Sequence, residues 1–243
     1  MREIYMILIT GASSDIGLAI VSNLERNGNR LLLHAHSDKG ANKIRANLNR
    51  PNDHIIFQVD FSDLNLISQE IEPLLKSNPI KGLVNCVAVR SRRPLKLLNP
   101  DHVAWVMRIN YFAFIELLRI VTKKGNHIPG LSIIQISSIS AQAGGTGVAA
   151  YAASKAAADI AIRSFAKELH KKSIRLNSIL CGQVDTYAYY TLMNGKSHDP
   201  VLDRQYLGLN RPEDISNLVS FLLSSDSSMI SGQFIPADGG YLQ

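Results

Sequence analysis

The sequence has few cysteines and a single tryptophan. The scarcity of cysteine excludes several classes of protein. Its 243 residues include only two cysteines, Cys86 and Cys181. Their separation does not match the closely spaced ligands of structural zinc sites, and two cysteines are too few for a disulfide-rich secreted domain. We therefore expect free, buried thiols and no metal site.

Long hydrophobic segments are also missing. The first apolar run, Ile4 to Ile9, is too short for the core of a signal peptide or for a membrane span. The uncharged stretch 131–154 is longer, but it contains many Ser, Gln, Gly and Thr residues that do not suit lipid hydrocarbon. The sequence therefore predicts a cytoplasmic protein that does not associate with a membrane.

Acidic residues are scarce in one part of the chain. The formal net charge is +6, and residues 81–130 contain nine basic and two acidic side chains. This segment can be an ordinary solvated surface, or it can attract an anionic partner such as a phosphate-bearing substrate or an acidic carrier protein. Nucleic acid is not expected as a partner, because aromatic residues are not interleaved and no recognition motif is present.

Short apolar runs alternate with helical patterns almost from end to end, in a chain with 46% hydrophobic residues. This alternation predicts a single-domain, doubly wound Rossmann fold over residues 1–243, with a seven-stranded parallel sheet flanked by helices on both faces. The expected strands are Ile4–Thr10, Leu31–Leu33, Ile55–Val59, Leu83–Val87, Ile133–Ser137, Ile174–Leu180 and Gln233–Ile235, the last ended by Pro236. The expected helices are one from Ile16 to Asn27-Gly28 and others over 39–48, 63–77, 101–123, 150–172 and 212–224.

Ligands bind beyond the carboxyl ends of the strands in such a sheet, so the loops at that edge carry the site. Residues 183–211, after the sixth expected strand, lack clear periodicity and include Tyr187, Gly195 and Pro200. A long irregular segment at this edge is typical of a mobile substrate lid, although a variable surface loop gives the same pattern.

A turn with two glycines, Thr10-Gly11-Ala12-Ser13-Ser14-Asp15-Ile16-Gly17, joins the first expected strand to the first helix. Gly11 permits a tight turn and Gly17 lets the helix pack close to the sheet, so that the helix N-terminus faces a pyrophosphate. Asp15 is unusual here, because a carboxylate repels a pyrophosphate. We expect its side chain to point away from the phosphates and to cap backbone N–H groups.

The end of the second expected strand indicates the choice of nicotinamide cofactor. Sites for NAD place an acid there, about 20 residues after the glycine turn, to bind the ribose 2′-hydroxyl. That position falls near Ala35, and the following His36, Ser37 and Lys39 suit a 2′-phosphate. Asp38 leaves NAD(H) open, but the sequence favours NADP(H).

Tyr151 and Lys155 lie four residues apart, on one face of an expected helix. An ammonium beside a phenol favours the phenolate, which lets tyrosine exchange a proton near neutral pH. Ser138 follows the fifth expected strand, at the edge where ligands bind, and its hydroxyl suits a substrate oxygen held between itself and Tyr151. The combination predicts proton transfer to or from an oxygen.

These motifs resemble those of the short-chain dehydrogenase/reductase family, in particular its 3-oxoacyl-[acyl-carrier-protein] reductases, over nearly the whole chain. The resemblance implies a catalytic tetrad in which Ser138 orients the carbonyl, Tyr151 protonates it, Lys155 holds the nicotinamide ribose and Asn110 anchors a water. The matching residues are Thr10-Gly11, Gly17, Asp60, Asn85, Asn110, Ser137-Ser138, Tyr151, Lys155, Asn177, Gly182, Thr186, Gly232 and Asp238-Gly239-Gly240.

The resemblance also implies a set of cofactor contacts. Asp60 would lie at the adenine, Asn85 along the cofactor, and Val184 and Thr186 near the carboxamide. The whole set is Gly11, Ser13, Ser14, Asp15, Ile16, Gly17, His36, Ser37, Asp60, Phe61, Asn85, Cys86, Val87, Tyr151, Lys155, Val184 and Thr186.

Three positions depart from the family's pattern. Asp15 replaces the middle glycine of the turn, Cys86-Val87-Ala88 follows Asn85 where Asn-Ala-Gly is usual, and Cys181 replaces a proline. All three lie on the cofactor side, so they leave open a non-catalytic dinucleotide-binding protein. The complete tetrad favours an enzyme that reduces a carbonyl to a secondary alcohol, or the reverse.

The leading substrate is a 3-oxoacyl thioester on an acidic acyl carrier protein, which the Lys123-Lys124 and Lys171-Lys172 pairs would contact. The alternative is a phosphorylated or nucleotide-activated sugar, with Arg90, Arg92 and Arg93 beside the mouth of the site. The candidate substrate contacts are Arg90, Gln142 and Tyr187.

Two long helices, at 101–123 and 150–172, are the usual assembly surfaces in this family. The second is rich in alanine, which permits close helix approach. The resemblance therefore implies a homotetramer.

Overall fold

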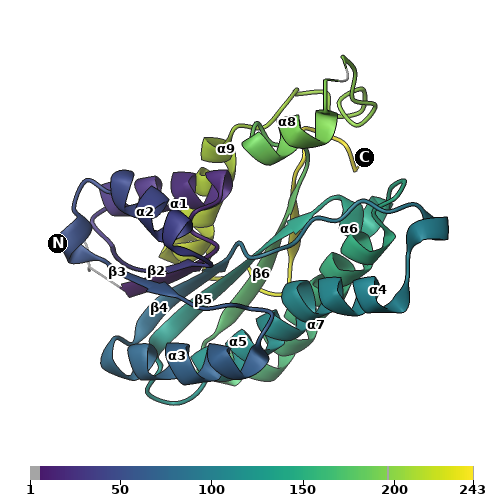
Figure 1. The fold of residues 1–243 in the computed structure, drawn as a ribbon. Coiled ribbons are helices and arrows are strands. Elements are labelled where there is room, and N and C mark those ends of the chain that lie inside the picture. Colours follow the sequence, from purple (N-terminus) through teal and green to yellow (C-terminus); the bar gives the residue numbers. More distant parts are fainter. Residues whose placement is uncertain (1–5, 196, 243) are drawn as a thin grey trace.

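The fold is built on one seven-stranded sheet whose strands all run parallel, in the order β3-β2-β1-β4-β5-β6-β7 (Figure 1). The computed structural model describes residues 6–195 and 197–242. Ile4 and Tyr5, at the start of the first predicted strand, lie outside the described residues. The strands are β1 (Met6–Thr10), β2 (Arg30–Ala35), β3 (Ile55–Gln58), β4 (Ile80–Asn85), β5 (His127–Ser138), β6 (Arg175–Cys181) and β7 (Phe234–Ala237).

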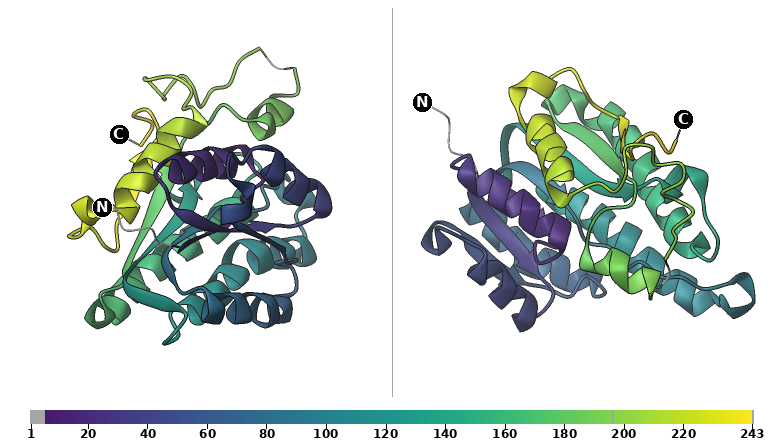
Figure 2. Two further views of the ribbon diagram at one scale, coloured as in Figure 1. Left: turned by 90° about the vertical axis from the view of Figure 1, so that its left-hand side faces the viewer. Right: turned by 90° about the horizontal axis from the view of Figure 1, so that it is seen from above.

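Helices cover both faces of the sheet, in two layers that Figures 1 and 2 show from three directions. One layer contains α1 (Asp15–Arg26), α2 (Asp38–Ala46) and α9 (Pro212–Leu223), with α1 and α9 side by side. The other contains α3 (Leu64–Ser77), α4 (Pro100–Met107), α5 (Ala113–Val121) and α7 (Ala149–Leu169). The doubly wound α/β fold predicted from the sequence is confirmed.

Each strand supplies side chains to both layers, because successive residues of a strand point to opposite faces. Leu8 and Leu83 pack into the core beneath α3, α5 and α7, whereas Ile7, Ile9 and Val84 pack into the core beneath α1 and α9. This two-sided burial explains the nearly continuous apolar runs that made the strands recognisable in the sequence.

The predicted helix over 101–123 differs from the structure in one respect. Between α4 and α5 the chain forms a π-helical segment, Arg108–Phe112, which contains Asn110. The Asn110 side chain hydrogen-bonds with both backbone groups of Val89 and with Ser154, at 2.8–3.0 Å. These contacts join distant parts of the chain and favour the extra residue in the turn, which no local pattern indicates.

Most strand ends also differ from the prediction, and β2, β4 and β5 are longer or shifted. β4 ends at Asn85, so Cys86 and Val87 belong to the following loop. β7 continues through Pro236 to Ala237 instead of ending before the proline. Proline has no backbone N–H to donate. It is tolerated there because β7 is an edge strand, with a neighbouring strand on one side only.

The segment 183–211 is more regular than predicted. It contains the short helix α8 (Tyr187–Met193), followed by turns, and it lies beyond the carboxyl end of β6 (Figure 1). In the described part of the chain, no helix is long and apolar enough to cross a membrane.

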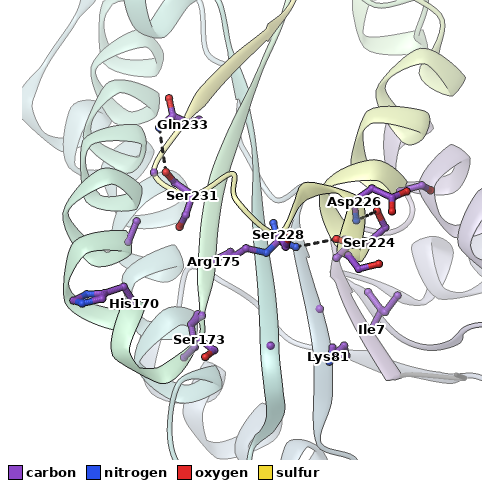
Figure 3. Close-up of a pocket in the computed structure, with 18 of the residues that line it drawn as sticks. Ile7, Lys81, His170, Ser173, Arg175, Ser224, Asp226, Ser228, Ser231 and Gln233 are labelled. Atoms are coloured by element: carbon purple, nitrogen blue, oxygen red, sulfur yellow. Dashed lines mark hydrogen bonds between the residues drawn. The ribbon is translucent and has the colours of Figure 1, made fainter.

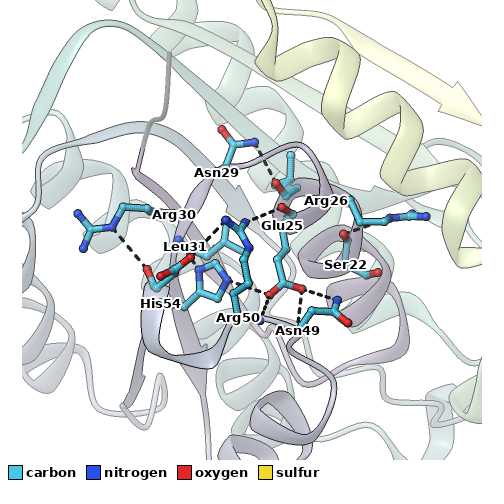
Figure 4. Close-up of polar contacts among 11 residues, drawn as sticks. Ser22, Glu25, Arg26, Asn29, Arg30, Leu31, Asn49, Arg50 and His54 are labelled. Atoms are coloured by element: carbon cyan, nitrogen blue, oxygen red, sulfur yellow. Dashed lines mark hydrogen bonds and ion pairs between the residues drawn. The ribbon is translucent and has the colours of Figure 1, made fainter. Parts of the chain in front are cut away.

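A buried carboxylate joins α1 to the turn before β3 (Figure 4). Glu25 is 2% exposed and accepts hydrogen bonds from the backbone N–H groups of Asn49 and Arg50, from the Asn49 amide and from His54 Nε2. His54 Nδ1 accepts from the N–H of Leu31, so the proton of the neutral ring lies on Nε2. Burial raises the pKa of Glu25, but the hydrogen bonds outweigh it and the pKa is lowered.

Candidate active site

A cleft of 730 Å³ opens at the carboxyl edge of the sheet. Its walls come from the N-terminus of α1, the loop after β4, the ends of β5 and β6, the first turns of α7, and α8. Its volume falls in the range typical of ligand pockets, about 300–1,000 Å³. The loops after β1, β4, β5 and β6 therefore surround one cleft, whereas His36 and Ser37 after β2 and Asp60 and Phe61 after β3 do not line it.

A larger cleft of 1450 Å³ lies at the opposite edge, where β1, β4 and β6 begin (Figure 3). Arg175 crosses it and donates to the backbone carbonyls of Leu222, Ser224 and Ile230. Its guanidinium is therefore occupied in holding the loop after α9. Ligands of parallel sheets bind at the other edge, so we place the active site in the smaller cleft.

The glycine turn adopts the compact shape that the sequence predicted. Gly11 has a φ of +65°, and a Cβ there would lie 3.0 Å from backbone atoms of Cys86 and Val87. Ser14 caps α1: its Oγ accepts from Gly17 N–H and donates to the Gly11 carbonyl. The turn thus packs against the loop after β4 and directs the start of α1 into the cleft.

His34 supports this turn, a role that the sequence analysis missed. Its Nδ1 accepts from Gly11 N–H at 3.1 Å, and Nε2 lies 2.8 Å from the carbonyl of Val59. Burial lowers the pKa of His34 to about 4, so the ring is neutral and donates from Nε2. The only signal in the sequence was a histidine directly after the apolar run that predicted the second strand.

Asp15 lines the cleft and bridges three elements. One carboxylate oxygen accepts from Lys43 Nζ of α2 at 3.1 Å, and the other accepts from the backbone N–H of Tyr187, at the start of α8, at 2.7 Å. Asp15 lines the cleft between these two partners, and its predicted orientation away from a bound pyrophosphate stays a prediction. The predicted acceptance of a backbone N–H is confirmed, but its donor belongs to α8.

Ser138, Tyr151 and Lys155 all line the cleft, so the structure brings together the three groups proposed for proton transfer. Lys155 Nζ lies 6.0 Å from the centre of the Tyr151 ring and donates to the carbonyl of Ile136 at 2.7 Å. Lys155 is 2% exposed and Tyr151 9% exposed, so both belong to a largely dehydrated pair at the base of the cleft.

The titration of Tyr151 differs from the sequence-based expectation. Burial raises the pKa of the phenol, and the Arg90 guanidinium and the Ser138 hydroxyl oppose that rise. Burial also lowers the pKa of Lys155. In this structure the neutral phenol is therefore the favoured form.

Asn110, the fourth tetrad residue, is fully buried and does not line the cleft. Its side chain fixes Val89 in the loop after β4 and Ser154 on α7. Because Tyr151 and Lys155 flank Ser154 on that helix, Asn110 joins the two walls of the cleft on either side of Tyr151.

The predicted cofactor residues fall into two groups. Ser14, Asp15, Ile16, Cys86, Val184 and Thr186 line the cleft together with Tyr151 and Lys155, whereas Gly11, Ser13, Gly17, His36, Ser37, Asp60, Phe61, Asn85 and Val87 do not. Asn85 is buried in the sheet, where it accepts from Thr10 and donates to Gln135. Phe61 is also buried and stacks on His34.

Beyond the carboxyl end of β2, exposed polar groups surround the position expected for the adenine ribose. His36 and Asp60 lie 3.9 Å apart with side chains 72% and 51% exposed. Ser37 caps α2 and accepts from Gly40 N–H. Asp38 accepts from the Gln58 amide at 2.9 Å, so this acid is held by β3.

Of the three candidate substrate contacts, Arg90 and Tyr187 line the cleft, as does Arg92. Gln142 lies on the short helix α6 (Ser140–Ala143), is exposed, and is not part of the cleft lining. Arg90 makes no hydrogen bond or ion pair with any described residue, so its guanidinium is available to a ligand.

The lysine pairs proposed to contact a carrier protein lie at the wrong edge of the sheet. Lys123 and Lys124 precede β5, and Lys171 and Lys172 precede β6, so both pairs are at the amino ends of the strands. The 21 residues of α7 separate Tyr151 from Lys171 by a helix of about 30 Å. Lys123 is also paired with Glu72 at 2.7 Å.

Comparison with known proteins agrees with this fold. The chain belongs to the short-chain dehydrogenase/reductase family: a family model described as enoyl-(acyl carrier protein) reductase matches residues 11–242. A 3-oxoacyl-[acyl-carrier-protein] reductase of Thermotoga maritima is 27% identical over 96% of each chain. The protein is thus an oxidoreductase that interconverts carbonyl and alcohol groups with a nicotinamide dinucleotide.

Solved structures are similar over the whole length. An actinorhodin polyketide ketoreductase with NADPH superimposes with a TM-score of 0.91 at 20% identity, covering 99% of this chain and 98% of the other. A blue fluorescent protein from a metagenomic library, in complex with NADPH, has a TM-score of 0.87 at 27% identity, with 98% of both chains covered. The predicted resemblance to this family is confirmed.

The residues of the cleft fit a dinucleotide. Ser14, Asp15 and Ile16, at the N-terminus of α1, line the cleft, where the positive end of the helix suits a pyrophosphate. Asp15 is the one carboxylate beside that position, and Lys43 partly neutralises it.

Proposed function

We propose that this protein is an NADP(H)-dependent reductase that converts a carbonyl to a secondary alcohol, with a 3-oxoacyl thioester as the leading substrate. The observation that carries the proposal is the convergence of Ser138, Tyr151 and Lys155 on one cleft beside the glycine turn. Similarity to 3-oxoacyl-[acyl-carrier-protein] reductases supports the substrate class.

The roles of the residues follow from their positions. The Ser138 and Tyr151 hydroxyls hold the carbonyl oxygen, and the cofactor supplies the hydride to the carbonyl carbon. Tyr151, whose pKa is raised by burial, is protonated before the reaction and gives its proton to the oxygen. Lys155, fixed on the Ile136 carbonyl, places a positive charge beside the nicotinamide ribose.

A preference for NADP(H) is supported by the groups beyond β2. No acid follows Ala35 directly, and Asp38 is hydrogen-bonded to Gln58. The exposed His36 ring, the Ser37 hydroxyl and Lys39 offer donors and positive charge to a 2′-phosphate. Several similar solved structures contain NADPH or NADP.

An anionic substrate is supported by Arg90 and Arg92 in the cleft lining. The loop that carries them is fixed, because Arg93 N–H donates to the Gly147 carbonyl at 2.7 Å and Arg92 Nε donates to Thr146. The same two arginines favour the second candidate, a phosphorylated or nucleotide-activated sugar, so the substrate panel must include both classes. An acidic carrier would approach at this edge of the sheet.

The segment 183–211 is proposed to act as the substrate lid. Its helix α8 forms one wall of the cleft and is attached to the glycine turn by the hydrogen bond from Tyr187 N–H to Asp15.

A homotetramer is also proposed, because large hydrophobic side chains are exposed on α4, on the π-helical segment after it and on α7. Trp105, Phe112 and Ile160 expose 43%, 47% and 56% of their surface. The molar mass in solution tests the assembly.

Turnover with NADPH tests the function. The panel contains a 3-oxoacyl thioester, a keto-sugar phosphate and a neutral ketone of similar size, with NADH as the matched cofactor control. We expect reduction of the thioester with NADPH. NADPH binding without turnover of any carbonyl would indicate the non-catalytic dinucleotide-binding protein, and strong turnover of the neutral ketone would exclude the anionic-substrate proposal.

A further inference from the structure

A fourth ionisable group lies behind the proton-transfer pair, outside the motifs that the sequence analysis used. Asp159 is on α7. Tyr151, Lys155 and Asp159 follow one another along this helix at intervals of about one turn. Its side chain is 2% exposed, as is that of Lys155. Phenol, ammonium and carboxylate therefore follow one another along the buried stripe of a single helix.

Two consecutive residues of β5 hold these two charges. Lys155 Nζ donates to the carbonyl of Ile136 at 2.7 Å, and the Ser137 hydroxyl donates to Asp159 Oδ2 at 2.9 Å. The next residue is Ser138, which lines the cleft. The carboxylate is thus fixed by the same strand that presents the substrate-facing serine.

Asp159 is only partly satisfied by hydrogen bonds. Its Oδ1 is buried and the Ser178 hydroxyl lies near the carboxylate, but among the described residues neither Oδ1 nor the Ser178 hydroxyl oxygen makes a hydrogen bond of good geometry. The nearby Ser178 and Ser137 hydroxyls favour its charged form, and so do the charges of Lys155 and of Arg163 one turn further along α7, but burial outweighs them. An incompletely satisfied buried carboxylate destabilises the fold, so its presence points to a role beyond packing.

We propose that Asp159 is a positioning residue for proton transfer, whose buried charge keeps Lys155 in the ammonium form and Tyr151 in the protonated form, and so suits the site to reduction. This inference rests on the proposed function of Tyr151 and Lys155. Charges one helical turn apart in a dehydrated interior interact much more strongly than they do in water.

The neighbouring groups set the direction of the effect. The charge of Asp159 raises the pKa of Lys155 against the effect of burial, and it adds to the raised pKa of Tyr151. Cys86 and Cys181 also face Lys155, but burial raises the pKa of each thiol to about 12, so both stay neutral. Arg90 and Ser138, which face Tyr151 from the other side, act in the opposite sense.

Removal of this charge has a defined consequence. In Asp159→Asn, which keeps the shape and the acceptor for Ser137, both Tyr151 and Lys155 lose their protons at lower pH. The alkaline limb of kcat/KM for reduction therefore moves down by about one pH unit, whereas oxidation at a fixed neutral pH becomes faster. Burial raises the pKa of Asp159 to about 6, so wild type and variant converge below that pH.

The experiment compares pH profiles of reduction and oxidation for wild type, Asp159→Asn and Glu168→Gln, which removes an exposed carboxylate from the same helix. We expect the shift in Asp159→Asn alone. An equal loss of activity at every pH, with the alkaline limb unmoved, would show that Asp159 has only a structural role. Ser137→Ala retains the carboxylate but removes its donor, so the pKa of Asp159 should rise. The pH below which this variant behaves like Asp159→Asn should therefore be higher than the corresponding pH for wild type.

A second readout does not depend on turnover. The ultraviolet absorbance of the Tyr151 phenolate, obtained as the difference from Tyr151→Phe, is titrated in wild type and in Asp159→Asn without substrate. A lower phenolate pKa in Asp159→Asn supports the inference even if no carbonyl substrate is turned over, which would contradict only the proposed function. An unchanged phenolate titration overturns the inference whatever the activity.

Discussion

Glu25 and Asp159 are both carboxylates with 2% exposure, yet they titrate in opposite directions. Glu25 accepts hydrogen bonds at both oxygens from the turn before β3, and its pKa is lowered. Asp159 accepts one hydrogen bond and its pKa is raised to about 6. Burial alone thus does not determine the pKa of a carboxylate. The number of hydrogen-bond donors around it decides whether the pKa is lowered, as at Glu25, or raised, as at Asp159.

This difference separates two regions of the molecule. Around Glu25, α1 and the α2–β3 connection form a network that stabilises the sheet far from the cleft (Figure 4). Along α7, Tyr151 and Lys155 line the cleft, and Asp159 behind them is buried with one carboxylate oxygen that lacks a partner among the described residues. Substitutions in the first region should change stability without changing chemistry, and substitutions in the second should do the reverse.

The largest effect is expected at Tyr151. Tyr151→Phe removes the proton donor but keeps the ring, so kcat for reduction should fall by about 10²–10⁴-fold while NADPH affinity and thermal stability change little. Steady-state kinetics, fluorescence titration and calorimetry measure the three quantities. Near-normal turnover would refute the proton-transfer role of Tyr151. The buried polar groups of α7 would then have no demonstrated catalytic role to set against the structural role of Glu25.

Much of this second region could be predicted from the sequence, and the reasons are local. Apolar runs and glycine turns defined the sheet, and the spacing of Tyr151 and Lys155 with the strand-end position of Ser138 placed all three in one cleft. The partners of Asp15 could not be predicted, because Tyr187 approaches it from a distant segment. Asp159 belongs to none of the motifs, and only the packing of α7 on β5 shows that it is buried.

Glu25→Gln should give the second-largest effect, on stability. A glutamine directs an NH₂ group at the N–H donors that now bind one of the carboxylate oxygens, so buried donors lose their acceptor. We expect a loss of about 1–3 kcal/mol in the free energy of unfolding, measured by urea denaturation, with kcat unchanged. Glu70→Gln, at an exposed position on α3, is the matched control.

The pH dependence of this loss follows from the lowered pKa of Glu25. A carboxylate with a folded pKa below its unfolded value stabilises the protein above the unfolded value, about 4.5, and this contribution is lost as pH falls through the folded pKa. The stability difference between wild type and Glu25→Gln should therefore be constant near neutrality and shrink in acid. A difference that grew in acid would contradict the assignment.

Asp15→Gly should have a smaller effect, on cofactor binding. The substitution removes the carboxylate beside the pyrophosphate position and frees Lys43, so NADPH should bind about three- to ten-fold more tightly. Asp15→Asn, which removes the charge but keeps an acceptor for Tyr187 N–H, should bind with intermediate affinity. Titration calorimetry measures both, and weaker binding by the glycine variant would contradict the repulsion argument.

The same variant tests the attachment of the lid. Without Asp15 the Tyr187 N–H loses its acceptor, so its hydrogen exchange should become faster in Asp15→Gly before any cofactor is added. Unchanged exchange would show that α8 is held by other contacts, whatever the effect on NADPH affinity.

The smallest effect is expected at Arg90, and its sign completes the comparison. Arg90 opposes the raised pKa of Tyr151 from the exposed side of the cleft, whereas Asp159 adds to it from the buried side. Arg90→Ala should therefore move the alkaline limb of reduction slightly upward, in the opposite direction to Asp159→Asn, and raise KM a few-fold for an anionic substrate only. Because the side chain is exposed, both effects should weaken as salt is added. Lys96→Ala, which removes an exposed cation from the same connection, is the control. If the alkaline limb moved in the same direction in Arg90→Ala and Asp159→Asn, the two charges would not act on Tyr151 as the structure indicates.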